Sequence, residues 1–187
     1  MARTGAAPAA YQLTAADWLE FPDDGRLYEI LGGELYVSPP PGIEHQRIAS
    51  RLHILLHQFL ADGRGEVLFA PTGVKLSEHN IPEPDLVVIL AEQAHKVGEA
   101  WIDGAPDLVV EILSPGTASR DLSVKREIYE QSGIPEYWIV DRKAGAIEVL
   151  TLEGGRYVRF GRFERGSILR SKRLTGLEAA VSSILPG

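Results

Sequence analysis

Two short apolar runs, each opened by Pro-Asp, stand out in the pattern of hydrophobic and polar positions along the chain. One runs from Pro84 to Leu90 and the other from Pro106 to Leu113, and their β-branched composition predicts buried strands. Residues 91–105, between the runs, are too many for a tight hairpin and suit a loop or a short extra element. The second run carries Glu111 in its middle, where an uncompensated charge would cost on the order of several kcal/mol.

The rest of the pattern mixes helices with strands. Residues 43–61 form the clearest predicted helix, because apolar residues recur there at helical spacing. A second helix is expected over residues 117–132, ended by Gly133. The shorter predicted elements are a helix at 14–20, a hairpin of 27–30 with 34–37, strands at 66–70, 74–77 and 156–163, a hairpin of 137–140 with 146–150, and a final helix at 174–185. This order predicts a mixed α/β domain.

An antiparallel pairing of the two Pro-Asp runs would place Asp85 opposite Glu111. Directly opposite residues have Cβ atoms about 4.5–5.5 Å apart, so the two carboxylates are expected to share one divalent cation. Mg²⁺ or Mn²⁺ suits such hard oxygen ligands. Asp107 fails the same test, because it lies four residues before Glu111, about 13 Å along a strand.

These residues resemble the PD-(D/E)xK nuclease superfamily, and the run GAPDLVVEILSPGTASRDLSVKREIYEQSGIPEYWIVD resembles the Uma-two-type restriction endonucleases. The likeness extends from about Tyr28 to Leu177. It implies a restriction-endonuclease-like core, a central mixed β-sheet flanked by helices. It also implies metal-dependent hydrolysis of DNA phosphodiester bonds to a 5′-phosphate and a 3′-hydroxyl. The chain departs from the superfamily at Leu113, where a lysine is expected two residues after the second carboxylate.

Lys125 is the expected substitute for that lysine. With Leu122 and Tyr129 it falls at three- and four-residue spacing, which predicts that it points toward the sheet. The Uma-two-type pattern also has a lysine in this place. Lys75, in the strand before Asp85, is the fallback. Asp121 is interpreted as a helix-start residue.

Glu44 is a third candidate carboxylate, because it precedes Ile48 by four residues and is expected on the buried side of its helix. The superfamily commonly has a glutamate on its first core helix, which would make Glu44 a further metal ligand. Placement in the first turn is equally explained by the helix dipole. His45 ranks below Glu44, because a histidine there is more often a surface or capping residue. His53 and His57 are expected on the solvent face.

Composition bounds these expectations. A chain of 187 residues fits one domain over residues 11–187, after a flexible tail at 1–10. The absence of cysteine excludes disulfides and thiolate zinc sites and fits a cytoplasmic protein. No apolar run approaches the roughly 18 residues of a membrane span. Cutting both strands of DNA would need two copies, so a homodimer is expected.

The net charge of −7 argues against a protein coated in positive charge for DNA. Residues 156–173 nevertheless hold six arginines and a lysine against one acidic residue, with aromatic residues interleaved. This stretch is either a phosphate-contacting surface or a solvated strand pair. If it is solvated, DNA would be held by Arg47, Arg51, Arg120 and Arg126 on the two helices. The acidic charge and Leu113 also leave open an inactive nuclease-fold domain that binds nucleic acid or a protein partner.

Overall fold

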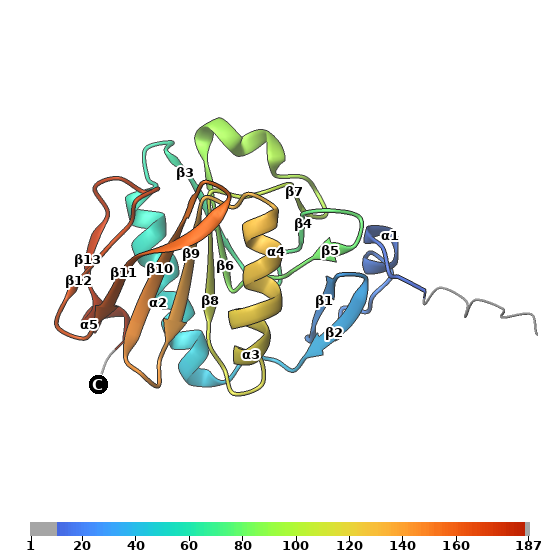
Figure 1. The fold of residues 1–187 in the computed structure, drawn as a ribbon, viewed down its shortest axis with the longest axis horizontal. Helices are drawn as coiled ribbons and strands as arrows, with labels where there is room; N and C mark the ends of the chain where they lie inside the picture. Colours follow the sequence, from blue (N-terminus) through green and yellow to red (C-terminus); the bar gives the residue numbers. More distant parts are fainter. Residues whose placement is uncertain (1–10, 186–187) are drawn as a thin grey trace, which may run out of the picture.

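A six-stranded mixed sheet forms the centre of the computed structural model, which describes residues 11–185 (Figure 1). Its strand order is β11-β10-β9-β8-β6-β3. The strands are β3 (Gly65–Phe69), β6 (Leu86–Leu90), β8 (Leu108–Ile112), β9 (Glu136–Asp141), β10 (Ala146–Glu153) and β11 (Arg156–Glu164). Within this sheet β8 and β9 are parallel, and the other neighbours are antiparallel. The predicted tail at 1–10 lies outside the described residues.

The two Pro-Asp strands pair as the sequence predicted. Leu86 of β6 lies opposite Val110 of β8, and Val88 lies opposite Leu108. Extending this register by one residue places Asp85 opposite Glu111. The connection between the strands contains the 3₁₀ helix η1 (Ala91–Lys96) and the short strand β7 (Ile102–Asp103).

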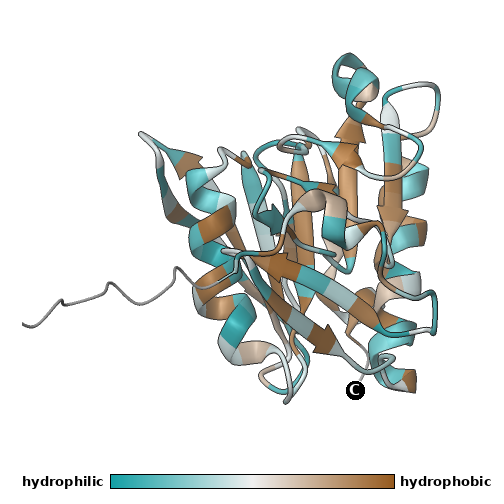
Figure 2. Cartoon of the chain, turned by 90° about the vertical axis from the view of Figure 1, so that its right-hand side faces the viewer, coloured by the Kyte–Doolittle hydropathy of each residue, from teal (hydrophilic) through white to brown (hydrophobic). Residues whose placement is uncertain are grey.

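Helices cover both faces of the sheet, whose central strands are largely hydrophobic (Figure 2). On one face, α2 (Ile43–Phe59) and α5 (Val181–Ile184) contribute to the largest core, which also includes residues of β6, β8, β9 and β10. On the other face lies one continuous helical segment, made of α3 (Ala118–Arg120), the π-helical η2 (Asp121–Lys125) and α4 (Arg126–Gln131). Tyr129 of this segment packs with Val109 and Tyr137. This arrangement confirms the predicted α/β sheet flanked by helices.

A smaller part of the fold lies beside the β6–β3 side of the sheet (Figure 1, right). It holds α1 (Ala15–Trp18), β1 (Leu27–Leu31), β2 (Glu34–Ser38) and β5 (Asn80–Ile81), with β1 between β2 and β5. The predicted hairpin at 27–37 is therefore confirmed. This part matters for function because β1 brings Glu29 to the central sheet.

Two expected elements differ from the structure. The strand expected at 74–77 is reduced to β4 (Val74–Lys75), which pairs in parallel with β7 and lies outside the central sheet. The helix expected over 174–185 is reduced to α5, and β12 (Ile168–Arg170) pairs with β13 (Glu178–Ala180) before it. The buried Glu136 carboxylate accepts hydrogen bonds from the amides of Lys172 and Arg173, which fixes a turn there. Gly176, at φ +90°, also breaks the helix.

None of the helices within residues 11–185 is long and apolar enough to cross a membrane.

Candidate active site

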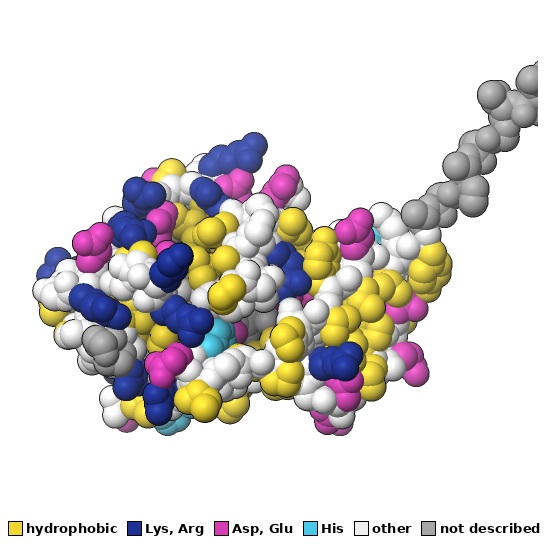
Figure 3. Space-filling model, turned by 90° about the horizontal axis from the view of Figure 1, so that it is seen from below, with side chains coloured by type: hydrophobic (Ala, Val, Ile, Leu, Met, Phe, Trp, Pro, Cys, Tyr) yellow, Lys and Arg dark blue, Asp and Glu magenta, His cyan; other side chains and the backbone are white. Residues whose placement is uncertain are grey.

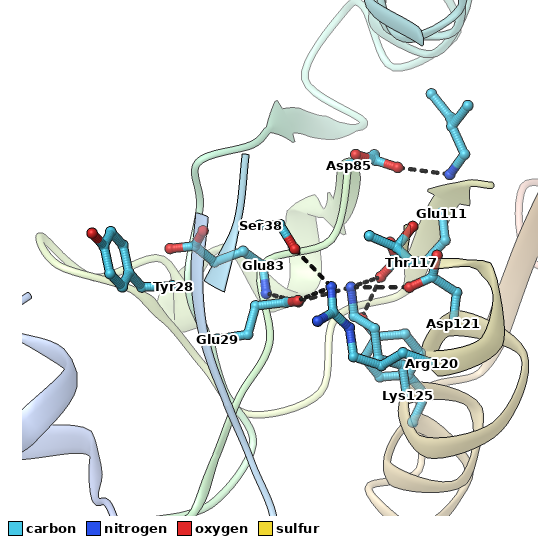
Figure 4. Close-up of polar contacts among 12 residues, drawn as sticks. Tyr28, Glu29, Ser38, Glu83, Asp85, Glu111, Thr117, Arg120, Asp121 and Lys125 are labelled. Atoms are coloured by element: carbon cyan, nitrogen blue, oxygen red, sulfur yellow. Dashed lines mark hydrogen bonds and ion pairs between the residues drawn. The ribbon is translucent and has the colours of Figure 1, made fainter. Parts of the chain in front are cut away.

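A buried lysine joins the helix to the sheet. The Nζ of Lys125 lies 2.5 Å from Glu111 Oε1 and 2.8 Å from Glu29 Oε1. Asp121 Oδ1 lies 3.8 Å from the same nitrogen. All four side chains are almost fully buried, and Figure 4 shows the three carboxylates around the ammonium. The predicted inward direction of Lys125 is confirmed.

Further donors hold the carboxylates of this cluster. The hydroxyl of Tyr129 donates to Glu111 Oε1 at 2.6 Å. Arg120 lies 3.1 Å from Glu29 Oε2 and donates to the hydroxyl of Ser38 at 2.9 Å. The backbone amide of Glu83 donates to Glu29 Oε1 at 3.0 Å. The site is therefore fixed by β1, β2, β8 and the continuous helical segment together.

Asp85 lies directly before β6, opposite Glu111, but its carboxylate is turned toward the backbone of β8 (Figure 4). Its Oδ2 accepts a hydrogen bond from the amide of Ile112 at 2.6 Å. The same oxygen lies 3.1 Å from Nε2 of His45, on α2. Asp85 therefore connects α2 to the end of β8, beside Glu111.

Negative charge predominates in this cluster. Its carboxyl groups belong to Glu29, Glu83, Asp85, Glu111 and Asp121, whereas its permanent cations are Arg120 and Lys125. Burial raises the pKa of Glu111 well above its usual range, Lys125 opposes the shift, and Asp121, Asp85 and Glu29 add to it. Burial also raises the pKa of Asp121.

The pKa of Glu83 is raised to about 7, first by burial and then by Glu29. Burial lowers the pKa of Lys125, but Glu111, Glu29 and Asp121 outweigh it and raise that pKa overall. Lys125 therefore stays charged at neutral pH. The unfavourable burial of charge instead raises the pKa values of the carboxyl groups. Asp121 Oδ1 is also buried without a hydrogen-bond partner.

A divalent cation fits this chemistry. Mg²⁺ usually keeps several waters and binds proteins through one or two carboxylates, and Asp85 and Glu111 offer such a pair. A bound cation would also offset the excess of buried negative charge. Within residues 11–185, however, no three histidine or acidic side chains are already arranged as a set of metal ligands.

The placement predicted for Glu44 is wrong. Its side chain is 58% exposed and pairs with Arg47. The buried residues of α2 are His45, Ile48, Leu52 and Leu56. Because successive helix residues point about 100° apart, only one of Glu44 and His45 faces inward. His45, ranked lower from the sequence, is the one that reaches Asp85.

The face predicted for the second helix is partly wrong. Leu122 is 47% exposed, whereas Asp121, interpreted as a helix-start residue, is buried beside Lys125. The π-helical turn at Asp121–Lys125 places these two side chains on the inward face. Such turns are frequent at functional sites.

The fallback lysine, Lys75, and the excluded carboxylate, Asp107, each have partners outside the cluster. Lys75 pairs with Glu78 at 2.6 Å and lies over the Trp101 ring. Asp107 accepts hydrogen bonds from Arg173 and from the amide of Leu90. The contacts of Asp107 are structural, which agrees with its exclusion from the metal pair.

Several cations of the stretch at 156–173 pair with carboxylates of neighbouring strands. Arg159 lies 2.9 Å from Glu148, and Arg170 lies 2.9 Å from Glu178. Lys172 pairs with Glu153 at 2.7 Å. These pairings favour the solvated-strand interpretation. Of the four helix arginines considered as alternative DNA contacts, Arg120 pairs with Glu29 in the buried cluster.

Glu29 is the main site residue that sequence reasoning missed. It lies inside the apolar segment LYEIL, where an uncompensated charge is as costly as it is at Glu111. Its partner could not be inferred, because β1 and the helical segment are distant in the chain. Tyr129 was expected on the correct helix face but not as a donor to Glu111.

Comparisons with known proteins bear on the family and the fold. Residues 15–182 match the family model Uma2, described as "Putative restriction endonuclease". A crystal structure titled as a "putative nuclease belonging to DUF820" from Anabaena variabilis aligns with a TM-score of 0.77 at 17% identity. The alignment covers 92% of this chain and 97% of that one, which shows a shared fold. No curated protein matches the chain.

Proposed function

Because the chain belongs to the Uma2 family, we propose that it is a metal-dependent endonuclease that hydrolyses DNA phosphodiester bonds. The observation that carries the proposal is the buried contact of Lys125 with Glu111, on the strand next to Asp85. A carboxylate pair and a lysine are the groups that the nuclease superfamily needs. Here the lysine comes from a helix, while Leu113 occupies the usual position.

Asp85 and Glu111 would hold Mg²⁺ or Mn²⁺. When bound, such a cation stabilises negative charge on a phosphoryl oxygen and makes water more acidic. Glu44 is not proposed as a ligand, because its exposed side chain is engaged by Arg47. His45 would orient Asp85 through the 3.1 Å contact.

Lys125 would act as a fixed positive charge. Its raised pKa keeps it protonated, so it is unsuited to remove a proton from water. Its role would be to stabilise the negative charge that develops on the phosphate in the transition state. Glu29 and Asp121 position it for this, since both lie within 4 Å of its nitrogen.

Cleavage by matched variants tests the proposal. Supercoiled and single-stranded DNA are incubated with the protein in Mg²⁺, Mn²⁺ or EDTA. Asp85→Asn and Glu111→Gln should each lose about 100-fold or more of the metal-dependent rate, whereas Glu44→Gln should retain it. Equal rates in Glu111→Gln and in the parent would refute the assignment.

A non-catalytic binding domain is the second candidate, and Leu113 favours it. Calorimetric titration with Mn²⁺ separates the two. Saturable binding that is lost in Glu111→Gln supports the nuclease.

A homodimer is proposed for double-strand cleavage, since one site cuts one strand. Sedimentation of the full chain would reveal it.

A further inference from the structure

A cleft of about 660 Å³ opens directly beside Asp85. One side is lined by residues of the small N-terminal part, and the other by residues of α2 and of the end of β3. Asp85, His45 and Glu83 also line it, so the candidate active site and the cleft share a wall. Its volume falls in the about 300–1,000 Å³ range of small-molecule sites.

Aromatic rings line the cleft from both parts of the fold. Phe21 and Tyr28 lie with ring centroids 5.3 Å apart in the N-terminal part. Phe69, at the end of β3, meets the ring of His53 edge-on at 5.1 Å. Phe69 is 59% exposed, so its ring is accessible to a ligand. These rings offer flat apolar surfaces to a planar ligand.

The distribution of charge separates the cleft from its surroundings. Inside it, the acidic Asp23, Glu83 and Asp85 outnumber Arg26, which would repel a phosphate that lacks a metal ion. Outside it, Lys and Arg side chains gather on one half of the face shown in Figure 3. The other half, which holds α1, β1 and β2, is largely hydrophobic (Figure 3). An uncharged planar group therefore suits the cleft, and phosphates suit its neighbourhood.

We infer that this cleft receives an unpaired nucleobase next to the phosphate that is cut. The inference rests on the proposed nuclease function and specifies its substrate. A base within a continuous duplex is stacked on both sides and has no free face to offer, whereas an unpaired or flipped base does. The preferred substrate is therefore single-stranded or locally opened DNA, and a duplex would be cut where its strands are open.

Binding in Ca²⁺, chosen to limit cleavage, tests the inference with a short oligonucleotide that carries the fluorescent base 2-aminopurine. The parent protein should bind the single strand at least about tenfold more tightly than the same sequence in a perfect duplex. The probe should be quenched on binding, because stacking on an aromatic ring quenches it. Equal affinity for both forms, without quenching, would overturn the inference.

Phe69→Ala is the decisive variant, because its exposed ring adds little to the core. It should weaken single-strand binding about tenfold and reduce the quenching, with duplex binding unchanged. The matched control is Phe160→Ala, which removes a ring that is 43% exposed on β11. Parent-like single-strand binding and quenching in Phe69→Ala would overturn the assignment of the cleft.

The cleavage experiment with Glu111→Gln distinguishes a failure of the base-binding inference from a failure of the proposed nuclease function. Metal-dependent cleavage that needs Glu111 but is indifferent to Phe69 removes the inference and keeps the nuclease. Quenching that depends on Phe69, without cleavage of any DNA, removes the nuclease and keeps a base-binding cleft.

Discussion

The ammonium of Lys125 lies 2.5 Å from Glu111 Oε1, and both side chains are buried. Glu111 belongs to β8 and Lys125 to η2, so the contact joins the sheet to a helix. Leu113, at the position where a superfamily lysine is expected, is partly buried and packs against the core around Tyr129. The helix therefore supplies the positive charge that the strand lacks.

Replacing Lys125 with methionine should lower both the free energy of unfolding and the rate of metal-dependent cleavage. The change leaves Glu111, Glu29 and Asp121 without their shared cation, so the free energy of unfolding should fall by about 3–5 kcal/mol in metal-free buffer at neutral pH. Urea denaturation would measure this loss. Mg²⁺ should restore more stability to the variant than to the parent, because it offsets the same charge.

The control for this change is Lys75→Met, which removes a lysine that pairs with Glu78 at a partly exposed position. It should retain the cleavage rate and nearly all stability. Loss of cleavage in Lys75→Met, with retention in Lys125→Met, would transfer the role to Lys75.

Glu83 should make stability depend on pH. Its pKa is raised from 4.5 to about 7, mainly by burial. A raised carboxyl pKa means that the folded state holds the proton more tightly, so this stability is present below about pH 4.5 and is lost as pH rises through about 7. Glu83→Gln cannot ionise, so it should be more stable than the parent by roughly 1–3 kcal/mol at about pH 8 and little changed near pH 4.

Denaturation of both proteins across this pH range checks the expectation. The exposed Glu66 on β3 provides the control variant, Glu66→Gln, whose difference from the parent should not vary with pH. A Glu83→Gln variant that is less stable than the parent at about pH 8 would contradict the raised pKa.

Asp107 should prove structural, although it follows a proline as Asp85 does. Arg173 lies 2.5 Å from its carboxylate, which is 1% exposed. Asp107→Asn should therefore lower the free energy of unfolding by about 3 kcal/mol and retain metal-dependent cleavage per folded molecule. Loss of cleavage in a fully folded Asp107→Asn would instead place this residue in the mechanism.

The sequence identified both central strands, because each Pro-Asp run is a short apolar, β-branched segment. Their antiparallel pairing was a hypothesis, suggested by the length of the connection between them. The observed register, with Leu86 opposite Val110, agrees. Lys125 was found for a similar reason, because helical spacing relates it to Tyr129.

The errors have physical causes of two kinds. Glu44 and His45 are neighbours in the first turn of α2, where a phase error of one residue exchanges the buried and the exposed side chain. Glu29 reaches Lys125 only because the β1–β2 hairpin packs beside the helical segment, a contact between segments far apart in the sequence. Local patterns do not determine such a contact.

Charge placement leads to a prediction about DNA binding. Since β8 and β9 are parallel, the turn after β9 lies at the same sheet edge as the end of β8, next to Asp85. This turn carries Arg142 and Lys143. The arginines of β11 and β12, by contrast, pair with glutamates of their own strands or neighbours. Phosphates should therefore be held at the site edge.

A salt series in Ca²⁺ tests this placement. Changing both Arg142 and Lys143 to glutamine should make the salt dependence shallower. The magnitude of the slope of log affinity against log salt should fall by about 0.7 per lost contact on single strands. The matched control changes Arg159 and Arg170 to glutamine, and its slope should equal that of the parent, because these arginines already have carboxylate partners. A reduced slope in the control alone would mean that β11 and β12 contact the phosphates, and the strand would then have to cross the sheet far from Asp85.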